Sequence, residues 1–224
     1  MSSIIRVHLV RHVPVINPGQ IWYGRDIPFD TTSDRVKSYF NQLAQALPHD
    51  PEKSLWLSSP YPRAIATAEG VISAIKHQEN CVLALHQDEG FIEQQYGVME
   101  GMKHEEVKQC AGAADYLSNM WNKPPQDGES MQMLQNRVAN SLDRIRKTAP
   151  EGCEDAVIFT HGGVIMAAYA HARGTRMIDV FKDKKSSLTP SFSYISCLTI
   201  SADRKSGQWT WNDQYLKGIG KEPS

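Results

Sequence analysis

Cysteine is scarce in this sequence, and the few cysteines form no cluster. Only four occur among 224 residues, and they are widely spaced: Cys81, Cys110, Cys153 and Cys197. Because no C-x-x-C pair is present, the spacing supports neither a zinc site nor a disulfide framework. We therefore expect reduced thiols that mostly fill the core, in a reducing compartment.

The chain also lacks an excess of charge and any long apolar run. Its formal net charge is -1, so it offers no basic surface for nucleic acid or for an anionic membrane. No apolar stretch approaches the ~18 residues that a membrane-spanning helix needs. Residues 1–12 also lack the apolar core and cleavage site of a signal peptide. These absences predict a cytoplasmic protein that binds neither nucleic acid nor membrane.

Short apolar runs are present, and they predict buried strands. Three of them cover residues 4–10, 55–57 and 156–159, and residues 82–85 are a possible fourth. Since these runs are apolar almost throughout rather than alternating, they suit strands that are covered on both faces.

Helical patterns follow the strands. Apolar residues at i, i+3, i+4 and i+7 are typical of a helix with one buried face, and they predict helices over residues 33–47, 61–75, 130–149 and 164–172. Ser33 is the predicted N-cap of the first helix, and Pro62 suits the first turn of the second.

The order of these elements predicts the fold class. Alternating strands and helices favour an α/β fold, a three-layer α/β/α sandwich with a mostly parallel sheet. Residues 193–200 and 208–212, joined by a turn, predict an antiparallel edge. We find no internal repeat or linker, so we expect one domain over residues 1–224. The irregular stretch 87–130 is expected to form a cap over one end of the sheet.

Polar residues follow three of the predicted strands. They are Arg11-His12, Ser58-Ser59-Pro60 leading to Arg63, and Thr160-His161-Gly162. In a doubly wound sheet, ligands bind outside the carboxyl ends of the strands. Each residue taken singly has a structural alternative, such as a surface ion pair. Together, two arginines and two histidines at one sheet end would repel each other, so we expect them to surround an anion such as phosphate.

The two histidines allow covalent chemistry as well as binding. A neutral imidazole can attack phosphorus and carry the phosphoryl group. Nearby guanidinium groups lower the pKa of a histidine, which keeps it neutral and nucleophilic. The leaving alkoxide then needs an acid. Glu93 and Glu100 are the candidates, ahead of Asp88 and Glu89, and the spacing alone does not choose among them.

Two other classes of protein remain open from the residues alone. A metal hydrolase could take its ligands from His8, His12, His161 and Glu93. The neighbouring arginines argue against it, because fixed positive charge repels a divalent cation. A pseudo-phosphatase would use the same pocket to dock phosphorylated partners without turnover.

Four segments together resemble the motifs of a known family: LVRHV at 9–13, SSPYPRAIATAE at 58–69, FIEQQYGVMEG at 91–101 and FTHGGVI at 159–165. In this order they resemble the histidine phosphatase superfamily, also called phosphoglycerate mutase-like. The resemblance covers roughly residues 4–170. It implies a phosphoglycerate mutase-like fold and metal-independent hydrolysis of a small-molecule phosphomonoester without a cofactor. The protein is expected to be a monomer or a homodimer.

The resemblance also implies a role for each matching residue. His12 would be the nucleophile that becomes phosphohistidine, and Glu93 would be the proton donor. The phosphate pocket would consist of Arg11, Arg63, His161, Gly162 and Asn17.

Three features depart from the family pattern. The glycine that follows the family's nucleophile is Val13 here. The position of its asparagine, seven residues after the arginine, holds Pro18, and Asn17 stands one residue earlier. Residues 18–29 resemble, one residue short, a loop of a bacterial branch that includes α-ribazole phosphatases. The side chains that would line its leaving-group side are Trp22, Tyr23 and Arg25; packing within the loop is the alternative for the two aromatic residues.

The spacing of the motifs favours a hydrolase over a mutase. The glycolytic mutases of this family carry a longer insertion between the acid and the second histidine, which closes the site against water. Here only 67 residues, 94–160, separate Glu93 from His161. A hydrolase is therefore expected, and phosphoglycerate mutase-type phosphoryl transfer is the alternative.

Overall fold

A six-stranded mixed sheet forms the centre of the computed structural model. The structure describes residues 3–16, 21–78, 82–110, 112–183, 194 and 196–216, with the side chains of the last strand described as far as Trp211. The strands are β1 (Ile4–Arg11), β2 (Ser54–Ser58), β3 (Leu85–Gln87), β4 (Asp155–Thr160), β5 (Cys197–Asp203) and β6 (Trp209–Leu216). Their order across the sheet is β3-β2-β4-β1-β5-β6.

The pairing confirms the predicted fold class. The strands β3, β2, β4 and β1 pair in parallel, whereas β5 runs antiparallel to β1 and β6 runs antiparallel to β5. Parallel neighbours end at the same edge of the sheet. The carboxyl ends of β1, β2 and β4 therefore lie side by side.

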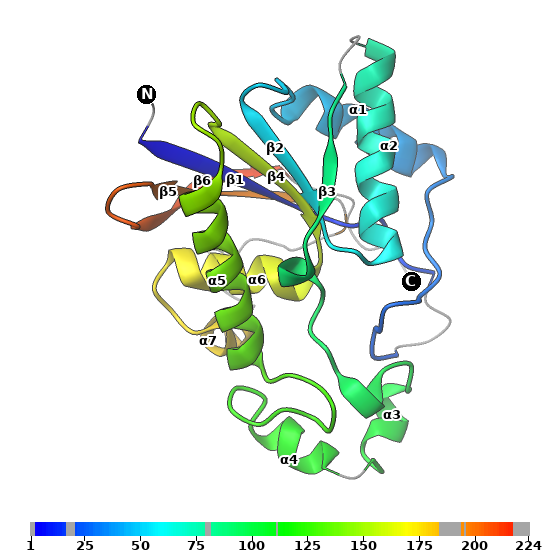
Figure 1. Ribbon diagram of the computed structural model, residues 1–224. Coiled ribbons are helices and arrows are strands. Elements are labelled where there is room, and N and C mark those ends of the chain that lie inside the picture. The colour runs from blue at the N-terminus through cyan, green and yellow to red at the C-terminus, as the bar shows by residue number, and fades with distance from the viewer. Residues whose placement is uncertain are drawn as a thin grey trace.

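Helices cover both faces of the sheet (Figure 1). The long ones are α1 (Asp34–Ala46), α2 (Pro62–Gln78), α5 (Met131–Thr148) and α6 (Gly162–Ala172). The pair α1 and α2 lies on one face, and α5 and α6 lie on the other, with the short α7 (Met177–Lys182) beside α6. The predicted N-cap of α1 is confirmed, since the Ser33 side chain accepts a hydrogen bond from Val36 N.

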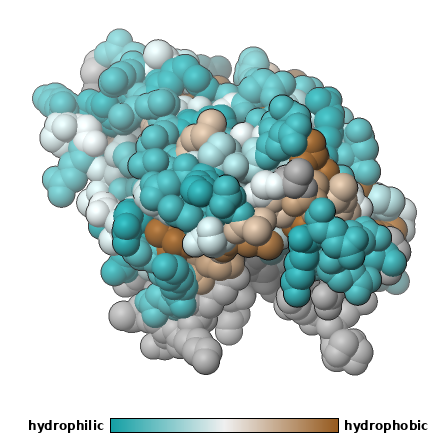
Figure 2. All heavy atoms as spheres, turned by 90° about the horizontal axis from the view of Figure 1, so that it is seen from below, coloured by the Kyte–Doolittle hydropathy of each residue, from teal (hydrophilic) through white to brown (hydrophobic). Residues whose placement is uncertain are grey.

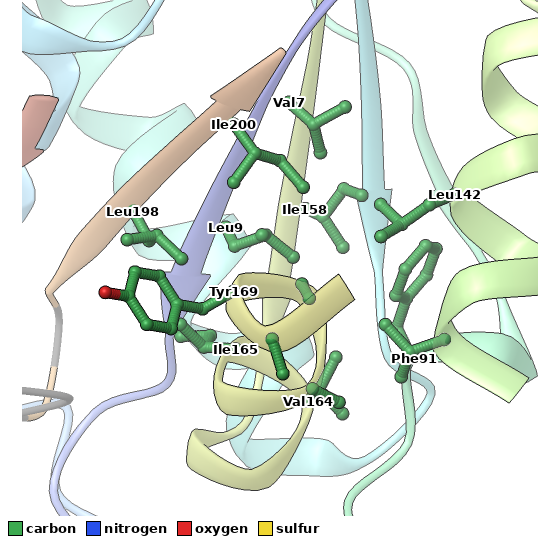
Figure 3. Packing of buried hydrophobic residues seen from close by; sticks show 14 of the residues in the cluster. Val7, Leu9, Phe91, Leu142, Ile158, Val164, Ile165, Tyr169, Leu198 and Ile200 are labelled. Atoms are coloured by element: carbon green, nitrogen blue, oxygen red, sulfur yellow. The ribbon is translucent and has the colours of Figure 1, made fainter. Parts of the chain in front are cut away.

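Each face of the sheet has its own apolar core, which explains why the strands are apolar almost throughout. On the side of α5 and α6, Leu9 and Ile158 pack against Ile165 of α6 (Figure 3). On the side of α1 and α2, Val10 lies in a second cluster with Phe40. Every residue of β4 is buried.

The connection from β3 to α5 contains the short helices η1 (Glu89–Phe91), η2 (Gly97–Met99), α3 (His104–Val107) and α4 (Ala113–Ser118). In Figure 1, α3 and α4 lie beyond the end of the sheet. A small apolar cluster of their own, which includes Met99 and Tyr116, holds them together. Seen from this end (Figure 2), apolar side chains lie in the middle of the molecular surface, between hydrophilic groups.

Two predicted boundaries need correction. The possible strand 82–85 is wrong in position, because β3 begins only at Leu85, which pairs with Trp56, and Val82 is 77% exposed. The terminal hairpin is present, but β5 continues to Asp203 because Ala202 pairs with Trp209. The turn is therefore shorter than the sequence suggests. Residues 193 and 195 of the predicted strand 193–200 lie outside the described residues.

Candidate active site

Three strand ends bring the predicted phosphate-binding side chains together. His12 directly follows β1, and His161 directly follows β4. Arg63 lies in the first turn of α2, just after β2. Backbone pairing continues past the strand ends, since His12 N donates to Thr160 O at 2.9 Å. The three side chains are at most 2% exposed.

The His12 ring is held in one orientation by a backbone carbonyl. Its Nδ1 bonds Val13 O at 2.6 Å, so this nitrogen carries the proton and Nε2 carries the lone pair. Arg63 Nε approaches Nε2 at 3.3 Å. Burial, followed by the charges of Arg63 and Arg11, holds the pKa of His12 well below 6.5. His12 is therefore neutral at pH 7, which is the state of an imidazole that can attack phosphorus.

Val13 stands where the family that the sequence resembles has glycine, and the structure accommodates its larger side chain. Its carbonyl serves His12, and its side chain is fully buried in the core on the α1 and α2 side. Val13 N donates to Thr67 Oγ1 at 2.9 Å, and that hydroxyl in turn donates to Arg63 O at 2.6 Å. The backbone beside His12 is thus tied to the helix that carries Arg63.

The Arg63 guanidinium also holds the loop that follows the N-terminal strand. Nη1 donates to Gly24 O at 2.9 Å and to Arg25 O at 3.0 Å. Its Nη2 is buried and has no hydrogen-bond partner within the described part of the chain. One edge of the guanidinium is thereby engaged by protein, and Nη2 remains for another acceptor.

The second histidine lies directly beside the first. The ring centroids of His12 and His161 are 5.1 Å apart. His161 Nε2 lies 2.8 Å from Ser59 Oγ, whereas its Nδ1 is buried without a partner among the residues described. Burial and then the Arg63 charge hold the pKa of His161 well below 6.5.

The two glycines that follow His161 let neighbouring side chains approach the backbone closely. A Cβ at Gly162 would lie 3.3 Å from Arg11 Cζ, and a Cβ at Gly163 would collide with Glu93 Oε1. Arg11 and the Glu93 carboxyl group therefore both pack onto the first turn of α6. The absence of a Cβ at Gly162 and Gly163 thus leaves room for both side chains at the start of α6.

Glu93 lies at the N-terminus of α6. One carboxylate oxygen accepts from Gly163 N at 3.3 Å and the other from Gln94 N at 3.0 Å. Burial lowers the pKa of the Arg63 guanidinium, and the nearby Glu93 charge acts in the opposite direction. The structure thus brings Glu93 to the same pocket as the basic residues.

Glu100, the second candidate acid, lies on another wall. It accepts a hydrogen bond from Tyr96 N at 3.1 Å, and a Cβ at Gly24 would lie 2.6 Å from its Oε2. Burial raises the pKa of Glu100. The two weaker candidates have other surroundings. Asp88 caps η1 and pairs with Arg144 at 2.5 Å. Glu89 is exposed to solvent.

Some predicted residues are not brought to this pocket. His8 lies further back on β1, where it bonds Asp155 at 2.8 Å and Thr199 at 3.0 Å. A metal centre built on His8 together with His12 therefore lacks support. Asn17 lies outside the described residues.

The aromatic residues of the predicted leaving-group loop have different surroundings. Trp22 meets Tyr96 edge-on at 4.6 Å and also contacts His104 and Tyr116, so packing within the loop and its neighbours accounts for it. Tyr23 shares a hydrogen bond with a residue that sequence reasoning missed, Tyr194.

Tyr194 stacks on Arg11, the arginine that precedes His12. Its ring centroid is 4.2 Å from Arg11 Cζ and 5.6 Å from the His12 ring. Burial raises the pKa of Tyr194 to about 12. Tyr194 precedes β5 in a segment without any motif, so no sequence signal pointed to it. Ser59, which was noted only as part of the approach to Arg63, is also in the pocket as the partner of His161.

Comparison with known proteins agrees with this geometry. The model of the histidine phosphatase superfamily (branch 1) matches residues 7–189, and the chain belongs to this family. No curated protein sequence matches it significantly. Among the described residues, no helix is long and apolar enough to cross a membrane.

Solved structures of the same fold include phosphatases and a mutase. The α-ribazole phosphatase from Shigella flexneri has a TM-score of 0.74 at 21% identity, over 98% of this chain and 100% of that one. A mycobacterial glucosyl-3-phosphoglycerate phosphatase has 0.69 at 19%, over 93% and 97%. A phosphoglycerate mutase from Bacillus anthracis has 0.66 at 18%, over 93% and 92%. At these identities the likeness establishes a shared fold.

Proposed function

We propose that the protein hydrolyses a small phosphomonoester through a phosphohistidine on His12. The observation that carries the proposal is the buried, neutral His12 ring, with Nδ1 held by Val13 O and Nε2 facing Arg63. A lone pair on Nε2 beside fixed positive charge suits attack on phosphorus and stabilises the charge that develops there. Membership of the histidine phosphatase superfamily supports the same chemistry.

The phosphoryl group is proposed to bind between Arg11, Arg63 and His161, over the start of α6. Arg63 Nη2 and His161 Nδ1 are buried without partners among the residues described, and such unpaired atoms are rare in folded proteins. Phosphate oxygens would satisfy Arg63 Nη2, and a helix N-terminus at Gly162 favours the same anion. Asn17 stays a prediction for this pocket.

The reaction is proposed to run in two steps that share one acid–base group. First, His12 Nε2 attacks phosphorus, the P–N bond forms, the ester P–O bond breaks, and the leaving alkoxide takes a proton from Glu93. Water then attacks phosphorus while Glu93 accepts its proton, and the P–N bond breaks. Inorganic phosphate leaves, and both His12 and Glu93 return to their starting protonation states.

We propose that no metal ion takes part. The arginines supply fixed positive charge where a metal would otherwise act. In the described ranges no three His, Cys, Asp or Glu side chains are grouped to hold a metal ion. Activity is expected to persist in EDTA. A loss in EDTA that a divalent cation restores would contradict this part of the proposal.

We also propose that the chain acts as one domain, in which the segment 87–130 caps the site and shapes the leaving-group side. Glu93, Glu100 and the aromatic cluster around Trp22 all belong to this segment or contact it. The leaving group that it accepts is best identified with a panel of phosphorylated metabolites.

The covalent step can be tested by quenching during turnover of a labelled monoester. An acid-labile, base-stable phosphoenzyme is expected in the wild-type protein and in His86→Ala, a control at an exposed position on β3. The label should be absent from His12→Ala. Label that persists in that variant would move the role to another residue, His161 first. Phosphate binding without label or turnover would identify a pseudo-phosphatase, and transfer of label to an added alcohol rather than to water would identify a mutase.

A further inference from the structure

Arg137 of α5 brackets the segment that carries Glu93. Its Nη1 donates to Gly90 O at 3.0 Å and to Ile92 O at 3.1 Å. Both carbonyls lie within the three residues that precede Glu93. One guanidinium nitrogen therefore holds two points of the backbone that leads to the proposed acid.

The other side of the same guanidinium engages a buried carboxylate. Arg137 Nε donates to Glu129 Oε2 at 3.2 Å, and Nη2 donates to Glu129 Oε1. Glu129 is 5% exposed. Its Oε1 also accepts from Gln95 N at 3.1 Å, and its carbonyl accepts from Gln94 Nε2 at 3.0 Å.

The backbone is therefore held on both sides of Glu93, by Arg137 before it and by Glu129 after it. Residues 90–95 form no part of the sheet. Two contacts tie this stretch to the end of β4 and the start of α6: Thr160 Oγ1 donates to Phe91 O at 2.7 Å, and Gly163 N donates to Glu93 at 3.3 Å. Hydrogen bonds from side chains, with one backbone bond from Glu129 N to Gln95 O at 2.8 Å, therefore hold the residues around Glu93 outside any strand pairing.

A buried ion pair adds little net stability, since desolvation of both charges offsets their attraction. Stability alone thus gives a weak reason for placing Arg137 and Glu129 here. The carbonyl contacts of Arg137 give a stronger one, because an arginine can hold a carboxylate and two backbone carbonyls at once with its planar fork of donors.

We propose that Arg137, together with Glu129, is the positioning residue for Glu93. It sets the distance of the Glu93 carboxyl group from the leaving oxygen, and within the described part of the chain its hydrogen bonds go to Gly90, Ile92 and Glu129 rather than to the phosphate pocket. This inference rests on the proposed function, in which Glu93 protonates the leaving group. It also gives a role to the Gly-Glu-Ser stretch that precedes α5.

The first test compares two leaving groups in Arg137→Lys. Lysine keeps the positive charge, which also acts on the pKa of His161. Its single ammonium group cannot bond both the backbone carbonyls before Glu93 and the Glu129 carboxylate at once. A displacement of Glu93 by about 1 Å should lower kcat on an alkyl phosphate by on the order of 10–100-fold. Hydrolysis of p-nitrophenyl phosphate needs little acid help and should fall less than about threefold. KM and inhibition by inorganic phosphate should stay within about twofold, because the phosphate pocket is unchanged.

Arg144→Lys is the matched control. Arg144 lies on the same helix and pairs with Asp88, but its side chain is 53% exposed, against 23% for Arg137. It should lose little on either substrate. In a Glu93→Gln background, Arg137→Lys should cause no further selective loss, because both changes remove the same function.

A stability control and an activity-free measurement complete the test. The pair Arg137→Met with Glu129→Gln removes both charges and so avoids an unpaired buried carboxylate. It should stay folded and show the same selective loss. The carbon-13 signal of the Glu93 carboxyl group should move in Arg137→Lys and not in Arg144→Lys.

Equal losses on both substrates, additivity with Glu93→Gln, or an unmoved Glu93 signal would each overturn the inference. Those outcomes differ from a failure of the proposed function. In that case the wild-type protein itself would form no phosphohistidine on His12, and the Glu93 signal would still report whether Arg137 positions the carboxyl group.

Discussion

The two halves of the candidate site are built in different ways. The phosphate half, with His12 and His161, stands directly on strand ends and is almost fully buried. The leaving-group half, with Glu93 and Glu100, lies in a segment of short helical turns and is only partly buried. Backbone pairing positions the first half, and hydrogen bonds from individual side chains position the second.

Because of this difference, the two halves should respond to different kinds of substitution. A ladder of backbone hydrogen bonds tolerates most side-chain substitutions, so the phosphate half should fail only when a contacting residue is removed. The leaving-group half is positioned by a few side chains that are far away in the sequence. Its function should therefore be impaired by substitutions of residues that do not contact the substrate. Four experiments follow from this contrast.

The largest effect is expected in the phosphate half, at Arg63. Arg63→Ala removes a buried guanidinium from beside His12 and should lower kcat/KM by about 10²–10³-fold, as for other preorganised electrostatic contacts. Because the phosphoryl group is common to all substrates, alkyl and p-nitrophenyl phosphates should suffer alike. Arg35→Ala, at an exposed position on α1, is the control and should change little. A folded Arg63→Ala protein with near wild-type activity would place the phosphate pocket elsewhere.

In the leaving-group half, Glu93→Gln should discriminate between substrates. We expect a loss of about 10²-fold or more on alkyl phosphates, whose alkoxides need a proton, and a small loss on p-nitrophenyl phosphate. Steady-state kinetics on both substrates measure the difference. Glu100→Gln is the matched variant, and if it alone shows the selective loss, the acid is Glu100.

Low pH should destabilise the folded protein through the two buried histidines of the phosphate half. The pKa values of His12 and His161 are held well below 6.5 in the folded protein, so below about pH 6.5 the unfolded chain binds more protons than the folded one. The free energy of unfolding should therefore fall as the pH falls, by up to about 1.4 kcal/mol per pH unit for each histidine. Above about pH 7.5 these groups should contribute no pH dependence. Denaturant titrations of wild type and His161→Gln measure the slope, and an unchanged slope in the variant would contradict the assignment.

The smallest effect is expected where the two halves meet, at the paired glycines. In Gly163→Ala the new methyl group displaces the flexible end of Glu93, so alkyl phosphate hydrolysis should fall about tenfold. In Gly162→Ala the new methyl group lies 3.3 Å from Arg11 Cζ, and a loss below about threefold is expected. Both proteins should stay folded, because alanine suits a helix better than glycine. A larger effect in Gly162→Ala than in Gly163→Ala would reverse the comparison.

The residues of the phosphate half could be predicted from the sequence more fully than those of the leaving-group half. Arg11, His12, Arg63 and His161 could be predicted together, because each follows an apolar run and parallel strands end at one edge. The acid could be narrowed only to Glu93 or Glu100, since spacing within an irregular segment does not decide which side chain faces α6. The apolar run at 82–85 gave a wrong strand position. Pairing with β2 begins only at Leu85, so Val82 lies before the strand and is exposed.

Local patterns of apolar and polar residues were enough to predict the fold class, the family motifs and, to within a residue at each end, the strands β1, β2 and β4. The partners that hold each functional group, in contrast, follow from the packing of distant segments. Ser59 bonds His161 across 102 positions of chain, Tyr194 stacks on Arg11, and Arg137 holds the carbonyls beside Glu93. Such contacts join segments far apart in the chain, and their geometry comes from the packing of helices onto the sheet, which no local pattern specifies.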